Sequence, residues 1–194
     1  TRSDAEIGAE TLLFEGAQGL MLDMDLGVMP HLTPSNTGLR NMIAIAGEAG
    51  VGEIQPLYMT RAYMTRHGAG PLKHETDTLP WAEVFDPTNR PNAWQGSLRL
   101  APLDLDETAR FIRRDLAVAE ASSVRIDAAI GISCLDQISG EAVLRRGGSP
   151  TRSARDELPS LVAAGTGLPV RLESFGPNRT DVRFRDNPED GATP

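Results

Sequence analysis

The stretch Phe14–Asn41 (FEGAQGLMLDMDLGVMPHLTPSNTGLRN) holds most of the chemical information in this chain. It follows a short apolar run, Thr11–Phe14, and passes two glycines that bracket Gln18. Apolar residues that enter a glycine-rich turn are typical of a buried strand that feeds a loop. The sequence therefore predicts a strand over residues 11–14 and a loop directly after it.

The end of the same stretch predicts a helix. Asn36 and Thr37 are residue types that cap helix N-termini, and the apolar positions Leu39, Ile43 and Ala46 follow at helical spacing. Backbone N–H groups and the helix dipole would make this end of the loop attractive to a phosphate. On physical grounds alone, a turn followed by a capped helix without a ligand is the commoner outcome.

The rest of the chain alternates short strands and helices. Leu105, Ala109, Ile112, Leu116 and Ala119 recur at spacings of four and three, which predicts a helix capped by Asp104 or Asp106. Further elements are predicted as strands at 54–64, 128–132, 170–174 and 182–185 and as a helix at 154–164. This order indicates an α/β fold, mainly a parallel sheet with flanking helices, that binds ligands at the carboxyl ends of strands.

Residues 1–186 are predicted to form one α/β domain and residues 187–194 a mobile tail. The segment 67–102 is rich in Pro, Gly and Asn and resembles a linker. Within it, Trp81 and Trp94 would anchor a long loop against the core, or else belong to a loop that closes over a ligand.

Composition narrows the function. The net charge of −8 argues against general nucleic-acid binding, and no apolar run is long enough for a membrane span. A single cysteine and a polar, acidic start favour a cytoplasmic protein. The three histidines, at positions 31, 67 and 74, lack the spacing of a metal site. Asp23 and Asp25 are either a paired acid/base or Mg²⁺ site or, more commonly, solvated loop carboxylates.

Four collinear segments resemble the adenylosuccinate synthase family. The first is EGAQG followed by Leu-Asp, a glycine and P-x-x-T-x-S-N-T, within Phe14–Asn41. The others are TRHGAGP at 65–71, ISCLD at 132–136 and SFGPNRT at 174–180. The order and spacing match over most of residues 11–186, so this chain is similar to the carboxy-terminal half of such a synthase.

The resemblance implies a P-loop-NTPase-like fold and a two-step ligation. A nucleoside triphosphate phosphorylates the 6-oxygen of a purine 5'-monophosphate such as inosine monophosphate, and the amino group of aspartate then displaces that phosphate. The residues expected to bind the purine monophosphate are Gln18, Thr33, Asn36 and Thr37. Those expected to bind the base of the triphosphate are Asp136, Ser174, Gly176 and Pro177. Arg99 and Arg90 are the candidates for the aspartate carboxylate.

The departures from the family pattern matter as much. The amino-terminal G-D-E-G-K-G-K segment and the family's catalytic residues are absent, so no catalytic residue is assigned within this chain. Mg²⁺ is implied by the family, but its usual ligands are not present. The chain is therefore expected to be an incomplete form of the fold, with an amino-terminal segment missing, and to pair as a homodimer. The alternative is a nucleotide-binding module that regulates or scaffolds without catalysis.

Two local changes affect nucleotide choice. Cys134 stands where the family usually has Lys, and the run before Leu103-Asp104 keeps one arginine, Arg99, where the common form has several. Both are similar to the shorter archaeal and phage-type branch. The resemblance therefore leaves open GTP or ATP as donor and inosine or guanine as the acceptor base.

Overall fold

The computed structural model describes residues 12–185, which divide into two compact units. Within the described range, the first unit holds residues 12–56 and 110–128, and the second holds 57–109 and 129–185. The expected tail at 187–194 lies outside the described residues. The single-domain boundary at residue 186 stays a prediction.

The first unit is built on one amphipathic helix. Helix α1 (Leu39–Glu48) buries Leu39, Ile43 and Ala46, the three apolar positions whose spacing predicted it. Its described part also holds the 3-10 helices η2 (Leu20–Leu22) and η3 (Ala117–Ala121), the parallel strand pair β1 (Glu53–Ile54) and β5 (Arg125–Ile126), and residues 110–116 of helix α2 (Leu105–Leu116).

The strand expected at residues 11–14 is wrong over its described part. Residues 12–14 have no strand partner, and the Leu13 side chain is 95% exposed. An apolar run becomes a strand only where a neighbouring strand accepts its backbone hydrogen bonds, and none lies beside these residues.

The cap of α1 also differs from the prediction. Gly38, not Asn36 or Thr37, is the N-cap residue and has no side chain to offer. Instead the Asp115 carboxylate accepts a 2.9 Å hydrogen bond from the Leu39 N–H, 76 positions earlier in the chain. The helix start is thus satisfied by a residue that no local pattern could indicate.

Helix α2 (Leu105–Leu116) confirms the most regular pattern in the sequence. Asp104 accepts a 2.9 Å hydrogen bond from the Glu107 N–H and so caps the helix, as one of the two predicted alternatives required. Acidic Asp106 and Glu107 lie in its first turn and basic Arg113 and Arg114 in its last, which suits the helix dipole.

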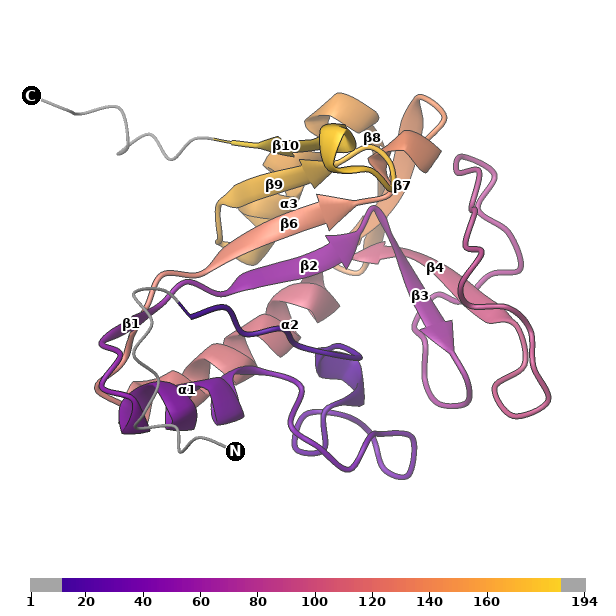
Figure 1. The fold of residues 1–194 in the computed structure, drawn as a ribbon. Helices are drawn as coiled ribbons and strands as arrows, with labels where there is room; N and C mark the ends of the chain where they lie inside the picture. The colour runs from indigo at the N-terminus through magenta and orange to yellow at the C-terminus, as the bar shows by residue number, and fades with distance from the viewer. Residues whose placement is uncertain (1–11, 186–194) are drawn as a thin grey trace, which may run out of the picture. The chain divides into compact units, whose positions relative to one another are not determined.

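The second unit contains two four-stranded sheets. The first has the order β10-β9-β6-β2, and the arrows of β2, β6 and β9 run side by side in one direction (Figure 1). Its strands are β2 (Leu57–Arg61), β6 (Ala129–Ser133), β9 (Val170–Ser174) and the antiparallel β10 (Val182–Phe184). Helix α3 (Leu158–Thr166) ends at Gly167 and contacts β9.

The second sheet has the order β3-β4-β7-β8. Strands β3 (Tyr63–His67) and β4 (Leu98–Asp104) are antiparallel, β4 and β7 (Glu141–Arg146) are parallel, and β7 returns through Gly147-Gly148 into β8 (Ser149–Ala154). Three features here differ from prediction. The strand expected at 54–64 is split over separate strands, the β7–β8 hairpin was not predicted, and the linker-like segment contains β4.

The α/β fold class is confirmed, with parallel strands and flanking helices. The largest fully buried side chains all belong to the second unit: Tyr63, Leu103, Leu105, Ile130, Ile132, Leu135, Leu144, Leu158 and Val162. Among the described residues, no helix combines the length and apolar character needed to cross a membrane.

Candidate functional site

In the first unit, a hydrogen bond joins the two ends of the loop that runs from Gln18 to Thr37. Gln18 has a positive φ of 66° and an exposed side chain, and Gly19 follows with a φ of 96°. The Thr37 hydroxyl donates a 3.0 Å hydrogen bond to the Gly19 carbonyl. The structure thus brings together the residues expected at the purine base and at the phosphate, because the two ends of the loop are bonded to each other.

Asp23 belongs to the same loop and is only 2% exposed to solvent. Its carboxylate accepts hydrogen bonds from the N–H groups of Asp25, Leu26 and Thr37 at 2.8, 3.2 and 2.6 Å. Burial opposes ionisation, but these N–H donors outweigh it and hold the pKa of Asp23 below its ordinary value. Asp23 is therefore neither a solvated carboxylate nor an open metal ligand.

Asp25 faces outward and orders its neighbours. It accepts a 2.8 Å hydrogen bond from the Asn36 amide and lies 3.2 Å from the Arg40 guanidinium. The Thr33 N–H donates to the Leu22 carbonyl at 2.8 Å. All four residues expected to hold the monophosphate therefore belong to one hydrogen-bonded loop.

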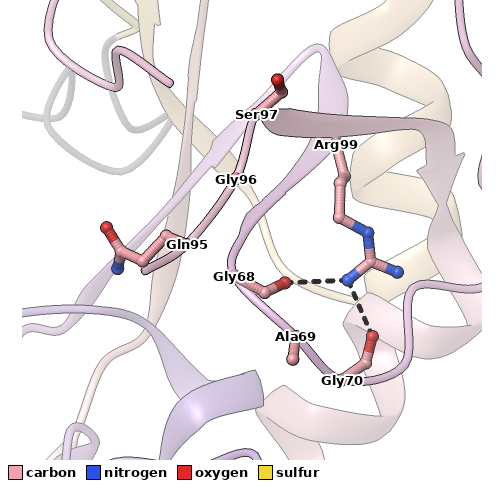
Figure 2. Close-up of a pocket in the computed structure, with 7 residues that line it drawn as sticks. All are labelled: Gly68, Ala69, Gly70, Gln95, Gly96, Ser97 and Arg99. Carbon is pink, nitrogen blue, oxygen red and sulfur yellow. Dashed lines mark hydrogen bonds between the residues drawn. The ribbon is translucent and has the colours of Figure 1, made fainter. Parts of the chain in front are cut away.

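In the second unit, a cavity of about 420 Å³ lies beside Arg99. Figure 2 shows the Arg99 guanidinium reaching two backbone carbonyls, at 2.9 Å to Gly68 and 2.8 Å to Gly70. Both glycines have positive φ, 94° and 112°, a conformation that side-chain-bearing residues rarely adopt. The remaining lining comes from Ala69, Gln95, Gly96 and Ser97.

A carboxylate of the chain itself meets the other edge of Arg99. Glu75 accepts two bonds from the guanidinium, 2.7 Å from Nε and 2.5 Å from Nη2. The second carboxylate-binding candidate, Arg90, does not line this cavity: its Nε donates to the Pro87 carbonyl at 3.1 Å. The structure therefore places Arg99, but not Arg90, at a cavity.

The residues expected at the triphosphate base lie at the carboxyl ends of neighbouring parallel strands. Strand β6 leads into Cys134, which has a left-handed φ of 61°, and then into the 3-10 helix η4 (Leu135–Gln137) that holds the exposed Asp136. Strand β9 ends at Ser174, whose hydroxyl donates to the Gly176 carbonyl at 3.0 Å. Because η4 contacts β9, Asp136 and the Ser174–Pro177 turn belong to one edge of the sheet.

Beside this edge is a contact that sequence reasoning missed. The Gln137 amide oxygen accepts a 2.5 Å hydrogen bond from the buried Tyr63 hydroxyl and a 3.1 Å bond from the Phe85 N–H. Burial raises the pKa of Tyr63 to about 12. No sequence signal pairs positions 63 and 137.

In the long loop at residues 67–102, the anchoring residue differs in part from the prediction. Trp94 is 95% exposed, so it does not anchor the loop to the core. Asp86 does this instead: it accepts bonds from Thr88 and Asn89 and pairs with Arg61 at 2.8 Å. Trp94 sits in a short turn formed by Asn92 and Gly96, where both backbone groups of Asn92 pair with Gly96.

Mg²⁺ is the divalent ion that the family resemblance implies. Residues 12–185 contain no cluster of three or more His, Cys, Asp or Glu side chains arranged to hold a metal. Mg²⁺ prefers several oxygen ligands in octahedral geometry, and Asp23 offers its oxygens to backbone N–H groups instead. The described residues do not fit the ion, and no step is derived through it.

Comparison with known proteins decides the relationship. Residues 3–97 match the family model for adenylosuccinate synthetase. Over this segment, just under half of its length, the chain is similar to the adenylosuccinate synthetase family. It is 40% identical over 94 residues to adenylosuccinate synthetase 1, chloroplastic, of Ricinus communis, a match that covers 43% of this chain and 20% of that protein. It is 43% identical over 76 residues to the enzyme of Colwellia psychrerythraea, covering 38% and 17%.

A likeness of fold to solved structures covers more of the chain than this segment. The fully ligated adenylosuccinate synthetase of Plasmodium falciparum matches 89% of this chain and 49% of its own, with a TM-score of 0.56 and 18% identity. The succinoaminodeoxyadenylate synthetase of cyanophage S-2L, bound to dGMP and dATP, matches 87% and 45%, with a TM-score of 0.53 and 16% identity. The chain thus spans about half the length of these solved proteins.

Proposed function

We propose that this chain forms the purine-monophosphate and triphosphate-base sites of an adenylosuccinate synthetase-type ligase, which joins aspartate to a purine 5'-monophosphate with hydrolysis of a nucleoside triphosphate. One observation carries the proposal. The segment that resembles the family most strongly folds into a loop whose two ends, at Gly19 and Thr37, are bonded to each other. Gln18 then reads the base while the segment Thr33–Thr37 binds the phosphate.

The second half of the proposal concerns the triphosphate. Asp136 would accept hydrogen bonds from ring N–H donors of its base, and the Ser174–Pro177 turn would line the same pocket. The sheet supports this assignment, because both segments follow parallel strands at one edge. Arg99 would bind the aspartate carboxylate after it exchanges Glu75 for the ligand.

The other family properties are carried over as proposals as well. We propose that the working enzyme contains an amino-terminal segment that supplies the phosphate-activating and Mg²⁺-binding residues, acts as a homodimer, and works in the cytoplasm. The nucleotide-binding module without catalysis is the second candidate. It is favoured by the Arg99–Glu75 pair, in which the carboxylate-binding arginine already holds a carboxylate.

Calorimetry with inosine monophosphate and with dGMP tests the proposal. Gln18→Ala is expected to weaken binding at least tenfold and to leave the melting temperature nearly unchanged, because the side chain is exposed. Gln55→Ala is the matched control, since Gln55 is an exposed glutamine of the same unit outside the loop. Binding by Gln18→Ala at wild-type strength, or no binding by the wild type, contradicts the proposal.

Catalysis separates the two candidates. The chain is mixed with a separately expressed amino-terminal half of a family member, aspartate and both nucleotides, and the succinylated product is measured. Product formation that depends on both halves supports the ligase. Nucleotide binding without product in every combination supports the binding module.

A further inference from the structure

Asp23 is a buried carboxylate of the first unit, and both of its oxygens accept hydrogen bonds. It is 2% exposed, and its two oxygens have different partners. Oδ1 accepts from the N–H groups of Asp25 and Leu26, two and three positions ahead, and so forms a local turn. Oδ2 accepts from the Thr37 N–H at 2.6 Å, across 14 positions of chain. One side chain therefore joins the start of the loop to its end.

The bonds around Thr37 extend this connection to the base-reading end. The Thr37 hydroxyl lies 3.5 Å from Oδ2 of Asp23 and donates to the Gly19 carbonyl at 3.0 Å. The backbone adds two more links between the arms of the loop, from Met24 N–H to the Ser35 carbonyl at 3.1 Å and from Thr33 N–H to the Leu22 carbonyl at 2.8 Å. The arms are thus held at a set separation.

The geometry rules out direct chemistry by Asp23. Its oxygens are shielded from solvent and already accept several hydrogen bonds, so they cannot reach a ligand or exchange a proton with one. The N–H donors stabilise the ionised form. Its effect on a bound nucleotide must act through Thr37, Asn36 and Gln18.

We propose that Asp23 is a positioning residue for the purine 5'-monophosphate, because its carboxylate sets the distance between Gln18 and the segment Asn36–Thr37. This inference rests on the function proposed above. A ligand that carries both a base and a 5'-phosphate engages both arms at once and depends on that distance. A nucleoside engages only the base-reading arm and does not.

The test compares the affinities of inosine monophosphate and inosine by calorimetry. Asp23→Asn keeps the size of the side chain but turns an NH₂ group toward backbone N–H donors, so one side of the network is lost. We expect the monophosphate affinity to fall at least tenfold and the inosine affinity to change less than about threefold. A purely structural role would lower both affinities together, and that result would overturn the inference.

Controls keep the outcomes distinct. Glu48→Gln removes an exposed charge at the end of α1 and should leave both affinities unchanged. A wild-type chain that binds no monophosphate refutes the proposed function itself. A wild type that binds, beside an Asp23→Asn variant with the same monophosphate-to-nucleoside ratio, refutes only the positioning role. If circular dichroism shows that the Asn variant is unfolded, Asp23→Glu replaces it, because its carboxylate oxygens are displaced by one methylene. The inference then requires that Asp23→Glu lowers the affinity for inosine monophosphate relative to the affinity for inosine.

Discussion

The Arg99 guanidinium, which lines the cavity, and the Glu75 carboxylate form a two-point ion pair, with Nε 2.7 Å from Oε1 and Nη2 2.5 Å from Oε2. Both side chains remain accessible, at 26% and 41%. The bonds from Arg99 hold the pKa of Glu75 below its ordinary value. A substrate carboxylate that uses Arg99 must therefore compete with Glu75.

This competition predicts the effect of Glu75→Gln. The neutral amide binds Arg99 more weakly than a carboxylate does, so a ligand carboxylate meets less competition. Aspartate affinity, measured by calorimetry in the presence of both nucleotides, should rise about two- to fivefold, as expected for an exposed ion pair. Glu83→Gln, an exposed glutamate of the same long loop, should have no effect. A lower affinity in Glu75→Gln would mean that Glu75 assists binding.

We predict that Gly38→Ala destabilises the folded protein. A Cβ atom at Gly38 would lie 2.0 Å from the Asp115 carboxylate oxygen that caps α1, so the alanine variant must break or displace that cap. We expect a loss of about 1–3 kcal/mol in the free energy of unfolding, measured with urea. Gly47→Ala, inside the same helix with no atom within 4 Å of its added Cβ, should instead gain up to about 1 kcal/mol. Equal changes in the two variants would contradict this.

We predict that Tyr63 makes the stability of the folded state fall at alkaline pH. Because its pKa is raised to about 12, the native state keeps the protonated phenol that the unfolded chain loses near pH 10. The stabilisation is complete below pH 10 and is lost as pH rises toward 12. Tyr63→Phe should lack this decline, and its absorbance titration should show only the tyrosinate of Tyr58. A wild-type titration with both phenols complete by pH 11 would exclude the raised pKa.

We predict that Cys134 leaves little preference between GTP and ATP. It stands where the family usually has a lysine, directly before the 3-10 helix that holds Asp136. A competition assay between GTP and ATP should therefore show at most a few-fold preference. Cys134→Lys should raise the GTP preference several-fold, while Cys134→Ser should leave it unchanged. A wild-type preference for GTP above tenfold would contradict the inference.

Much of the candidate site could be predicted because it depends on short, ordered motifs. The family resemblance assigns Gln18, Asn36 and Thr37 to one segment, and in the structure that segment forms one loop. Asp136 and Ser174 were identified from separate motifs, and the sheet brings their segments to a common edge because β6 and β9 are parallel neighbours. Their roles toward ligands stay predictions.

The sequence by itself determined the helices α1 and α2, the α/β class and the likeness to the adenylosuccinate synthetase family, because apolar periodicity and motif order are local properties of the chain. Only the tertiary structure decided which carboxylates bind donors within the protein and which residues form strands. Asp115 caps a helix 76 positions away, Asp23 closes a loop across 14, and Glu75 reaches Arg99 across 24. Such partners depend on where the folded backbone places a donor near an acceptor, and sequence spacing carries no information on that distance.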